Sequence, residues 1–381
     1  MMAKLGEVCK VSTSTKNIER QGAWLLNLDM VEQQTGRVIE YKYVGEDDLN
    51  GSIIQFDTEN VLYSKLRPNL NKVVLPPKDG FSTSELLPLR PDARVLNRDY
   101  LAVFLRSDSF VTWAVSKTAG AKMPRLGTKD LMNAEIPVPT IEQQKKIAEK
   151  FKKLEQLISL RKQQLAKLNE LVKARFVEMF GDCKTNPKNW KTKALEKIAN
   201  VGSSKRVFVE ELQDSGIPFY RGTEIGALAE KKAVIPALFI TEEHYKQLCE
   251  TTGKPQKGDL LMPSICPDGR IWIVDTDEPF YFKDGRVLWV HLTSANYNSV
   301  FLLYTLKDRI MTDYASIASG TTFAELKIFA LKKCKIFDVP LELQNQFANF
   351  VERVDQQKQT IQQSLEKLEL MKKALMQEYF G

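Results

Sequence analysis

The amino-acid sequence predicts an α+β protein made of two similar modules in tandem. Each module is a mixed α/β globular part followed by a long helix, and the two helices form a coiled coil. Three observations predict this fold: the sequence matches itself at a shift of two hundred residues, short β-branched runs precede each matching stretch, and heptad patterns fill it. We therefore expect four segments, at 1–140, 141–181, 182–340 and 341–381.

Size and composition bound the possible functions. A chain of 381 residues is long enough for two or three domains. No apolar run is long enough to span a bilayer, so we expect no membrane association. The five cysteines are scattered and form no Cys-x-x-Cys motif, and there are only two histidines. This pattern argues against a disulfide framework and a metal site, and it favours the reducing cytoplasm.

The internal repeat is clearest in its helical part. Residues 141–181 and 341–381 are identical at 13 of 41 positions without a gap. The match extends upstream through pairs such as Gly120 and Gly320, and then weakens to a pattern: "KLGEVCKVSTSTK" echoes "ALEKIANVGSSKR". The helices are thus more alike than the globular parts. We infer that both helices do the same work and that each globular part recognises something different.

The globular parts contain strand signals in the same order. In the first, "NVLYSKL" and "NKVVLP" read as strands, and a helix is expected in "RDYLAVFLRSDSFVTWAV". In the second, "GDLLMPSI", "RIWIVD" and "RVLWVHL" are the strand candidates, and a helix is expected in "YNSVFLLYTLKDRI". The shared order predicts one mixed α/β fold used twice.

Both long helices carry an apolar seam that steps alternately by four and three residues. This spacing over nearly five heptads is typical of a coiled coil. Polar residues interrupt the seam at different steps, Arg161 in the first helix and Lys358 in the second, so the helices are not interchangeable. The apolar seam positions are Ile147, Phe151, Leu154, Ile158, Leu165, Leu168, Val172, Met179, Phe347, Val351, Val354, Ile361, Leu365, Leu368, Leu375 and Tyr379.

Signals at the helix ends and outside the seam complete this prediction. Thr140-x-x-Gln143 after Pro139 is a capping box that starts the first helix, and Gly181 suits its C-terminal cap. The second copy lacks the box. Further apolar residues lie outside the seam and predict an additional packing partner, either the globular parts or another subunit: Leu157, Leu160, Leu171, Phe176, Phe350, Leu370 and Met376.

No catalytic motif is present. The sequence has no Walker A loop, no dinucleotide fingerprint, no nucleophile elbow and no His-Glu-x-x-His, so we expect neither catalytic residues nor a cofactor in this chain. The net charge of +7 permits a nucleic-acid partner without requiring one. Candidate DNA-binding residues, chosen because their types contact phosphates and base edges, are Lys65, Arg67, Asn69, Lys122, Arg125, Ser204, Lys205, Arg206, Arg221, Thr223, Arg270, Thr321 and Thr322.

The whole chain resembles the specificity subunit of type I restriction–modification enzymes. "AEIPVPTIEQQKKIA" with "LNELVKARFVEMFGD" is the most specific part of the resemblance, and "VLYSKLRPNLNKV" and "GFSTSELLPLRPD" resemble stretches of that family's target recognition domains. The second copy departs at "DVPLELQNQFA", where Leu343 replaces the first glutamine.

The resemblance implies a mechanism that the residues alone do not show. Each globular part would be a target recognition domain for one half of a bipartite double-stranded DNA sequence, and the antiparallel helices would set the spacer. The helices would dock two modification subunits, which carry S-adenosylmethionine and methylate adenine. Restriction subunits would add translocation and cleavage, with ATP and Mg as their cofactors.

Three alternatives remain at this point. One is a coiled-coil scaffold without a nucleic-acid role, which predicts no salt-dependent DNA binding. Another is a nuclease or methyltransferase in its own right, against which the missing motifs argue. The third is the recognition subunit of another multi-subunit DNA modification system.

Overall fold

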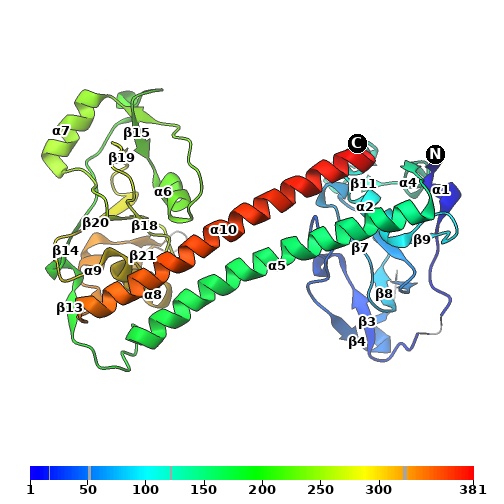
Figure 1. The fold of residues 1–381 in the computed structure, drawn as a ribbon, viewed down its shortest axis with the longest axis horizontal. Helices are drawn as coiled ribbons and strands as arrows, with labels where there is room; N and C mark the ends of the chain where they lie inside the picture. The colour runs from blue at the N-terminus through cyan, green and yellow to red at the C-terminus, as the bar shows by residue number, and fades with distance from the viewer. Residues whose placement is uncertain (17, 50–52, 121, 321–323) are drawn as a thin grey trace. The chain divides into compact units, whose positions relative to one another are not determined.

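The computed structural model describes residues 1–16, 18–49, 53–120, 122–320 and 324–381. The chain divides into two compact units (Figure 1): unit 1 is Met1–Gln164 with Ile361–Gly381, and unit 2 is Leu165–Thr360. Each unit contains one globular part, half of helix α5 (Ile141–Phe180) and half of helix α10 (Leu341–Phe380). The predicted arrangement of two mixed α/β parts, each followed by a long helix, is confirmed.

Unit 1 begins with many short elements before α5. Its strands are β1 (Met2–Lys4), β2 (Cys9–Val11), β3 (Ala23–Leu26), β4 (Lys42–Val44), β5 (Ile53–Phe56), β6 (Val61–Ser64), β7 (Val73–Val74), β8 (Gly80–Thr83), β9 (Leu86–Pro91), β10 (Thr118–Ala119), β11 (Arg125–Leu126) and β12 (Glu135–Pro137). Its helices are α1 (Leu5–Val8), α2 (Arg98–Leu105), α3 (Asp108–Ser116) and α4 (Thr128–Met132), with 3-10 turns η1 (Leu28–Met30), η2 (Glu46–Leu49) and η3 (Pro68–Leu70).

Unit 2 repeats most of this order after α5. Its strands are β13 (Thr192–Ala194), β14 (Ala199–Gly202), β15 (Ile217–Tyr220), β16 (Phe239–Ile240), β17 (Leu260–Pro263), β18 (Trp272–Ile273), β19 (Tyr281–Phe282), β20 (Val287–Leu292), β21 (Ala318–Ser319), β22 (Glu325–Leu326) and β23 (Lys335–Phe337). Its helices are α6 (Gly222–Ala229), α7 (Glu242–Thr252), α8 (Ser299–Ile317) and α9 (Ile328–Lys332), with 3-10 turns η4 (Leu195–Lys197) and η5 (Val209–Glu211).

The first sheets of the two units correspond strand by strand, and the second sheets share a parallel pair. Unit 1 has a four-stranded sheet in the order β2-β9-β6-β7, and unit 2 has the order β14-β20-β17-β18. A second sheet contains one parallel pair in each unit, β3 with β8 and β15 with β19. Short antiparallel pairs close each module, β1 with β12 and β13 with β23. The repeat seen in the sequence is therefore a repeat of topology, including the parts where identity is lost.

One expected helix of the first globular part is instead two helices. The segment "RDYLAVFLRSDSFVTWAV" forms α2 and then α3, with a break at Arg106 and Ser107. Ser107 has extended backbone angles, and its side chain accepts a hydrogen bond from the backbone N–H of Phe110. A serine in this position caps a new helix and stops the preceding one. The corresponding segment of unit 2 stays in one helix, α8, which is distorted at Asp313.

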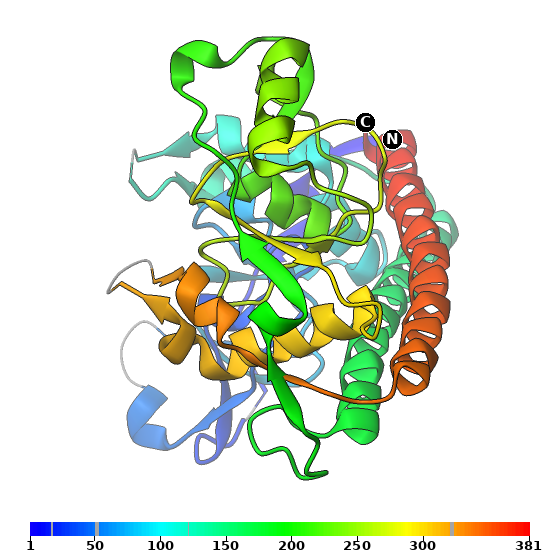
Figure 2. The same cartoon turned by 90° about the vertical axis from the view of Figure 1, so that its left-hand side faces the viewer.

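Within each unit the two half-helices lie side by side and antiparallel (Figure 2). In unit 1, Lys150 Nζ donates to Tyr379 Oη at 2.9 Å, and farther along the helix Lys162 pairs with Glu369 at 3.0 Å. In unit 2, the rings of Phe176 and Phe347 are 5.5 Å apart. The sixteen apolar seam positions are all buried or half-buried. These contacts agree with the heptad pattern.

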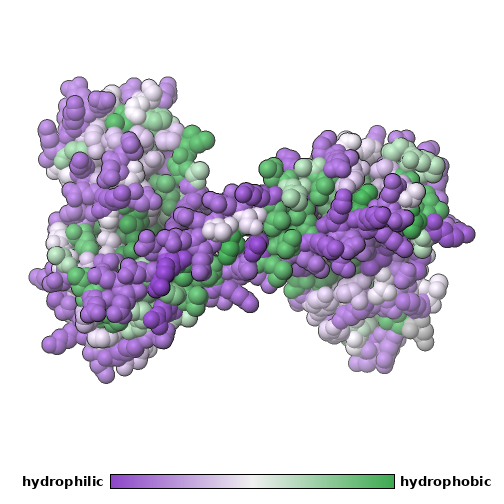
Figure 3. All heavy atoms as spheres, viewed as in Figure 1, coloured by the Kyte–Doolittle hydropathy of each residue, from purple (hydrophilic) through white to green (hydrophobic). Residues whose placement is uncertain are grey.

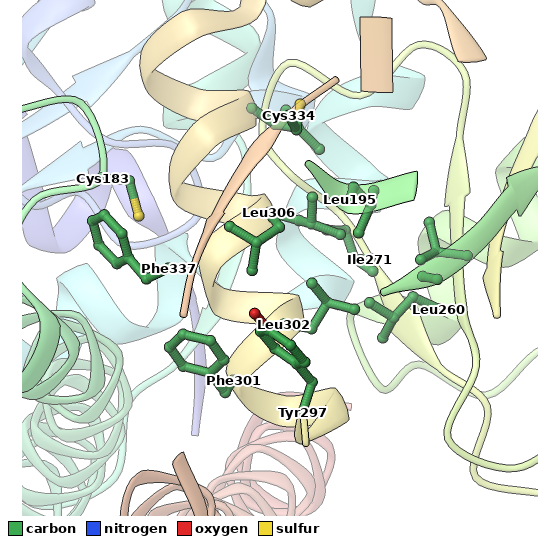
Figure 4. Close-up of a cluster of buried hydrophobic side chains, with 14 of the residues drawn as sticks. Cys183, Leu195, Leu260, Ile271, Tyr297, Phe301, Leu302, Leu306, Cys334 and Phe337 are labelled. Carbon is green, nitrogen blue, oxygen red and sulfur yellow. The ribbon is translucent and has the colours of Figure 1, made fainter. Parts of the chain in front are cut away.

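The ends of the helices are part of the globular cores. In unit 1, Phe380 contacts Tyr100 and Phe104, so the last turn of the chain packs against the first globular part. In unit 2, Phe180 packs against Phe301, and Figure 4 shows the surrounding core, to which α8, β17 and β23 contribute. Each globular part therefore requires side chains from both helices to bury its core.

Of the additional apolar residues, two pack against the globular parts, which is one of the two partners expected for them. Phe176 and Met376 are buried, at 2% and 8% exposure, because they belong to the cores of their own units. Phe350 is half-buried. The four leucines Leu157, Leu160, Leu171 and Leu370 remain exposed, at 45%, 54%, 47% and 69%.

Candidate nucleic-acid interface

The first group of predicted residues lies where the loop after β6 meets the β10–β11 hairpin. The backbone N–H of Leu126 donates to the carbonyl of Lys65 at 2.9 Å, and that of Arg67 donates to the carbonyl of Pro124 at 2.8 Å. Leu66 also forms a bridge with Arg125. The fold thus brings Lys65, Arg67 and Arg125, which are up to sixty residues apart in sequence, to one place.

The cations of this group differ in their availability. Arg125 forms an ion pair with Glu85 at 3.0 Å. The side chains of Lys65, Arg67 and Lys122 have no ion-pair or hydrogen-bond partner among the residues that the structure describes. Arg67 has a φ of +49°, a conformation that non-glycine residues rarely adopt. Arg67 is exposed, so its guanidinium is presented to solvent from a loop held by its own backbone.

Asn69 follows in the same loop and is exposed. Its carbonyl accepts a hydrogen bond from Gln34 Nε2 at 3.0 Å, which fixes the backbone and leaves the side-chain amide facing water. An exposed amide of this kind can donate and accept at once, which is what recognition of an adenine edge requires.

In unit 2 the corresponding loop after β17 is held by the same kind of backbone hydrogen bond, but its arginine is paired with an acid. The backbone N–H of Leu326 donates to the carbonyl of Ser264 at 2.7 Å, which matches the bond between Leu126 and Lys65. Arg270 in this loop is paired with Asp268 at 2.8 Å. The predicted residues Thr321 and Thr322 lie outside the described residues.

Arg221 and Thr223 belong to the N-terminal turn of α6, where both bind Glu224. The Arg221 guanidinium forms an ion pair with that carboxylate at 2.5 Å, and Thr223 Oγ1 donates to it at 2.7 Å. Burial raises the pKa of Glu224, and the hydrogen bonds from Arg221 and Thr223 lower it further than burial raises it, to about 2. The charge of Arg221 is therefore already matched within the helix turn.

Ser204, Lys205 and Arg206 lie in the loop after β14. Ser204 Oγ donates to the carbonyl of Phe282 at 2.6 Å, so this hydroxyl holds the loop to β19. Lys205 is exposed, and the Arg206 guanidinium lies 5.4 Å from the ring centre of Phe208. The loop therefore presents two cations on an anchored backbone.

Each unit has a buried acid–base pair whose basic member takes the same strand position, and no sequence pattern indicated them. Asp57 is 2% exposed and accepts from Arg90 Nη2 at 2.6 Å and from Ser14 Oγ at 2.7 Å. Asp259 is 3% exposed, and its Oδ1 is 2.7 Å from His291 Nδ1. The echo between the two stretches before β3 and β15 set Ser14 against Ser204, but Ser204 donates to the carbonyl of Phe282 and takes no part in the pair of unit 2.

Unit 2 has a surface pocket of about 340 Å³ beside its acid–base pair. It lies between β14, β20 and the segment after α7. Asn200, Ser203, Lys254, Trp289 and His291 are among its lining residues. Among the described residues, no group of three or more His, Cys, Asp and Glu side chains could hold a metal ion. No helix built from these residues is long and apolar enough to cross a membrane.

The chain was compared with known proteins. The family model "Type I restriction modification DNA specificity domain" matches residues 1–170 and again residues 187–370. The MjaVIII specificity subunit of Methanocaldococcus jannaschii is 24% identical over 78% of this chain and 73% of its own length. The EcoDI specificity subunit of Escherichia coli is 25% identical over 39% of this chain, and the match spans only 34% of that relative.

A solved structure supports the fold. A chain described under complex assembly and conformational transition of the type I R-M system superimposes with a TM-score of 0.61 at 18% identity. The superposition covers 100% of this chain and 97% of the other. At this identity the likeness concerns the fold alone.

Proposed function

This chain belongs to the family of type I restriction–modification DNA specificity proteins, and we propose that it selects the DNA target of such a system. The observation that carries the proposal is the repeated topology with different loop chemistry. The matching loops carry unpaired Lys65 and Arg67 in unit 1 and a paired Arg270 in unit 2. Two recognition domains that share one fold but differ in their contact residues suit a bipartite, asymmetric target on double-stranded DNA.

We propose that α5 and α10 set the distance between the two half-sites. Their seam extends over nearly five heptads, and each helix is 40 residues long without an internal proline or glycine. A continuous helix is stiff over this length, so its residue count fixes a spacing in a way that a loop cannot.

The exposed leucines of the helices are our candidates for docking two modification subunits. Leu157 and Leu171 lie fourteen residues apart on α5, which places them on the same helix face. Figure 3 shows hydrophobic side chains among hydrophilic ones along the helices. Acids elsewhere on the two helices contact the globular parts instead: Glu155 of α5 pairs with Arg106, and Asp355 of α10 pairs with Lys231. Such a division leaves the leucine face for a partner.

The chemistry of the complex is assigned to other subunits in this proposal. Modification subunits would bring S-adenosylmethionine and methylate adenine, and restriction subunits would bring ATP, Mg, translocation and cleavage. This chain would contribute no catalytic group and would act in the cytoplasm, where the DNA is. Purified alone with S-adenosylmethionine and DNA, it should transfer no methyl group, and robust transfer would contradict its non-catalytic role.

The decisive experiment is methylated-base sequencing of genomic DNA with and without the gene for this chain. We expect a bipartite, asymmetric methylation motif that disappears when the gene is deleted and returns when it is restored. Exchange of residues 182–340 for those of a relative is the matched control, because it should change only one half of the motif. A methylation pattern that ignores the deletion would reject target selection by this chain.

A further inference from the structure

We propose that Arg90 and His291 are equivalent DNA-backbone contacts, each held by a buried carboxylate so that it meets a phosphate of its own half-site. The inference rests on the proposed function and adds a specific contact to it. The ligand is a phosphodiester group of double-stranded DNA. Its site in unit 2 is the pocket beside His291, and its site in unit 1 is the surface around Arg90.

The strand registers establish that the two residues are equivalent. Arg90 on β9 lies opposite Lys10 on β2, and His291 on β20 lies opposite Asn200 on β14. Both β9 and β20 are the second strands of their four-stranded sheets, next to the edge strands β2 and β14. The acid that holds each side chain comes from the segment just before β6 or β17. The same architectural position therefore carries a basic group in both modules, although the residue type has changed.

In unit 2 the buried acid fixes the orientation of the histidine ring. Asp259 Oδ2 accepts from Trp289 Nε1 and from the backbone N–H of Gln256, both at 2.8 Å, and Oδ1 is 2.7 Å from His291 Nδ1. With Nδ1 directed to the carboxylate, the remaining ring nitrogen, Nε2, is the one available for a ligand. The imidazole is 30% exposed, so it can be reached from solvent.

In unit 1 the arginine is oriented in a similar way. Asp57 takes one Arg90 N–H group, while Ser14 and the backbone N–H of Glu59 occupy other positions on the carboxylate. The other N–H groups of Arg90 have no partner among the described residues, and its side chain is 34% exposed. Arginine donates from a rigid planar fork, so fixing one N–H group also aims the others.

The charge around both places favours an anion. Each buried carboxylate is already engaged by its basic partner, and the exposed lysines nearby form no ion pair among the described residues, although Lys10 is near enough to Asp92 to help lower the pKa of that carboxyl. In unit 2, Lys254 lines the pocket and the exposed Lys205 follows Ser203 in the loop that forms one wall. In unit 1, Lys10 is exposed directly opposite Arg90. A phosphodiester offers the single negative charge and the acceptor oxygens that such a set of donors matches.

The test measures DNA affinity against salt concentration for the complex of this chain with its modification subunits. The variants are Lys254→Ala, Lys10→Ala, His291→Ala and His291→Arg. Loss of one phosphate contact should weaken binding to target and non-target DNA by the same factor and lower the slope of log affinity against log salt by about one. We expect this for the three alanine variants, whereas His291→Arg should keep both slope and affinity, since unit 1 has arginine there.

The controls separate this inference from the function on which it rests. Lys246→Ala removes an exposed cation of α7 in the same unit and should leave the slope unchanged. Because Lys254 and Lys10 are exposed, their variants should fold normally even if a histidine variant does not. An unchanged slope for both lysine variants would overturn the inference, as would a changed base preference in one half-site. If the unaltered complex binds no bipartite target, the proposed function itself fails.

Discussion

The side chain of Gln144 accepts a hydrogen bond from the backbone N–H of Asn97 at 2.7 Å, and so joins the first turn of α5 to the start of α2. Its amide nitrogen donates to the carbonyls of Val95 and Pro139, and the side chain is fully buried. Gln344 makes the same three bonds in unit 2, with the N–H of Asn298 and the carbonyls of Asn296 and Val339. This glutamine is therefore the common element of both junctions.

Replacement of Gln144 by alanine should destabilise unit 1 more than removal of the capping box. Gln144→Ala removes a fully buried side chain, leaves one N–H and two carbonyls without their partly buried hydrogen bonds, and should cost about 3 kcal/mol. Gln143→Ala is the matched control: Gln143 bonds with Thr140 at the exposed helix start, and its loss should cost about 1 kcal/mol. Urea unfolding of the two variants shows which one loses more free energy of unfolding. Equal losses would contradict the role of the buried glutamine.

The acid sensitivity of unit 1 should depend on Asp57. Burial raises the pKa of its carboxyl, and hydrogen bonds from Ser14, Arg90 and the backbone of Glu59 lower it more, so the net value lies below the ordinary 3.8. A carboxyl with a lowered folded pKa contributes stability above its unfolded pKa and loses it as the pH falls through the folded value. Between pH 6 and pH 2 the free energy of unfolding, measured with urea, should therefore fall less in Asp57→Asn than in the unaltered chain. A loss of the same size in both would show that other groups cause it.

Lengthening both helices by one heptad should lengthen the target. Seven residues add about 10 Å to a helix, which corresponds to roughly three base pairs of B-DNA. The insertions belong after Gln164 in α5 and after Thr360 in α10, so that the seam stays in register. Methylation motifs of the variant should keep both half-sites and gain about three base pairs between them. An insertion in α5 alone is the control, since it breaks the register between the helices. If the gap between the half-sites stays the same in the doubly lengthened chain, the helices do not set this distance.

A charge on the leucine face should weaken assembly without affecting folding. Leu157 and Leu171 are exposed and contribute little to the cores, so aspartate at either place should leave the unfolding transition unchanged. If this face docks modification subunits, each substitution should weaken binding of a modification subunit by about tenfold or more. Gln156→Asp, on a neighbouring exposed position, is the matched control. Isothermal titration with purified modification subunit gives the comparison, and unchanged affinity in both leucine variants would exclude this face.

The strongest sequence predictions came from periodic features. The strands in "NVLYSKL", "GDLLMPSI" and "RVLWVHL" are present as β6, β17 and β20, and the two heptad stretches are uninterrupted helices. Short alternating runs and heptads report local geometry, which neighbouring residues decide. The break between α2 and α3 went unpredicted, although Ser107 stands in the polar run "RSDS" between two apolar stretches, where a serine can start a new helix.

The candidate site was predictable only in part. The type of a residue indicates which contacts its side chain can make, but not whether an acid of the same chain already pairs with it. Lys65, Arg67 and Lys122 have no side-chain partner among the described residues, whereas Arg221, Arg125 and Arg270 meet acids contributed by their own units. Arg90 and His291 were missed since their importance depends on acids about thirty residues away in sequence, Asp57 and Asp259.

By itself the sequence determined that this protein is a duplicated module with two long heptad helices, because repeats and periodicity are properties of the chain order. Only the tertiary structure decided that each globular core is closed by both helices, with Phe380 packing beside Tyr100. It also decided which glutamine of the junction is buried and which cations remain free. These properties depend on contacts between distant residues, where burial and the nearest charge set the energy, and no local pattern records them.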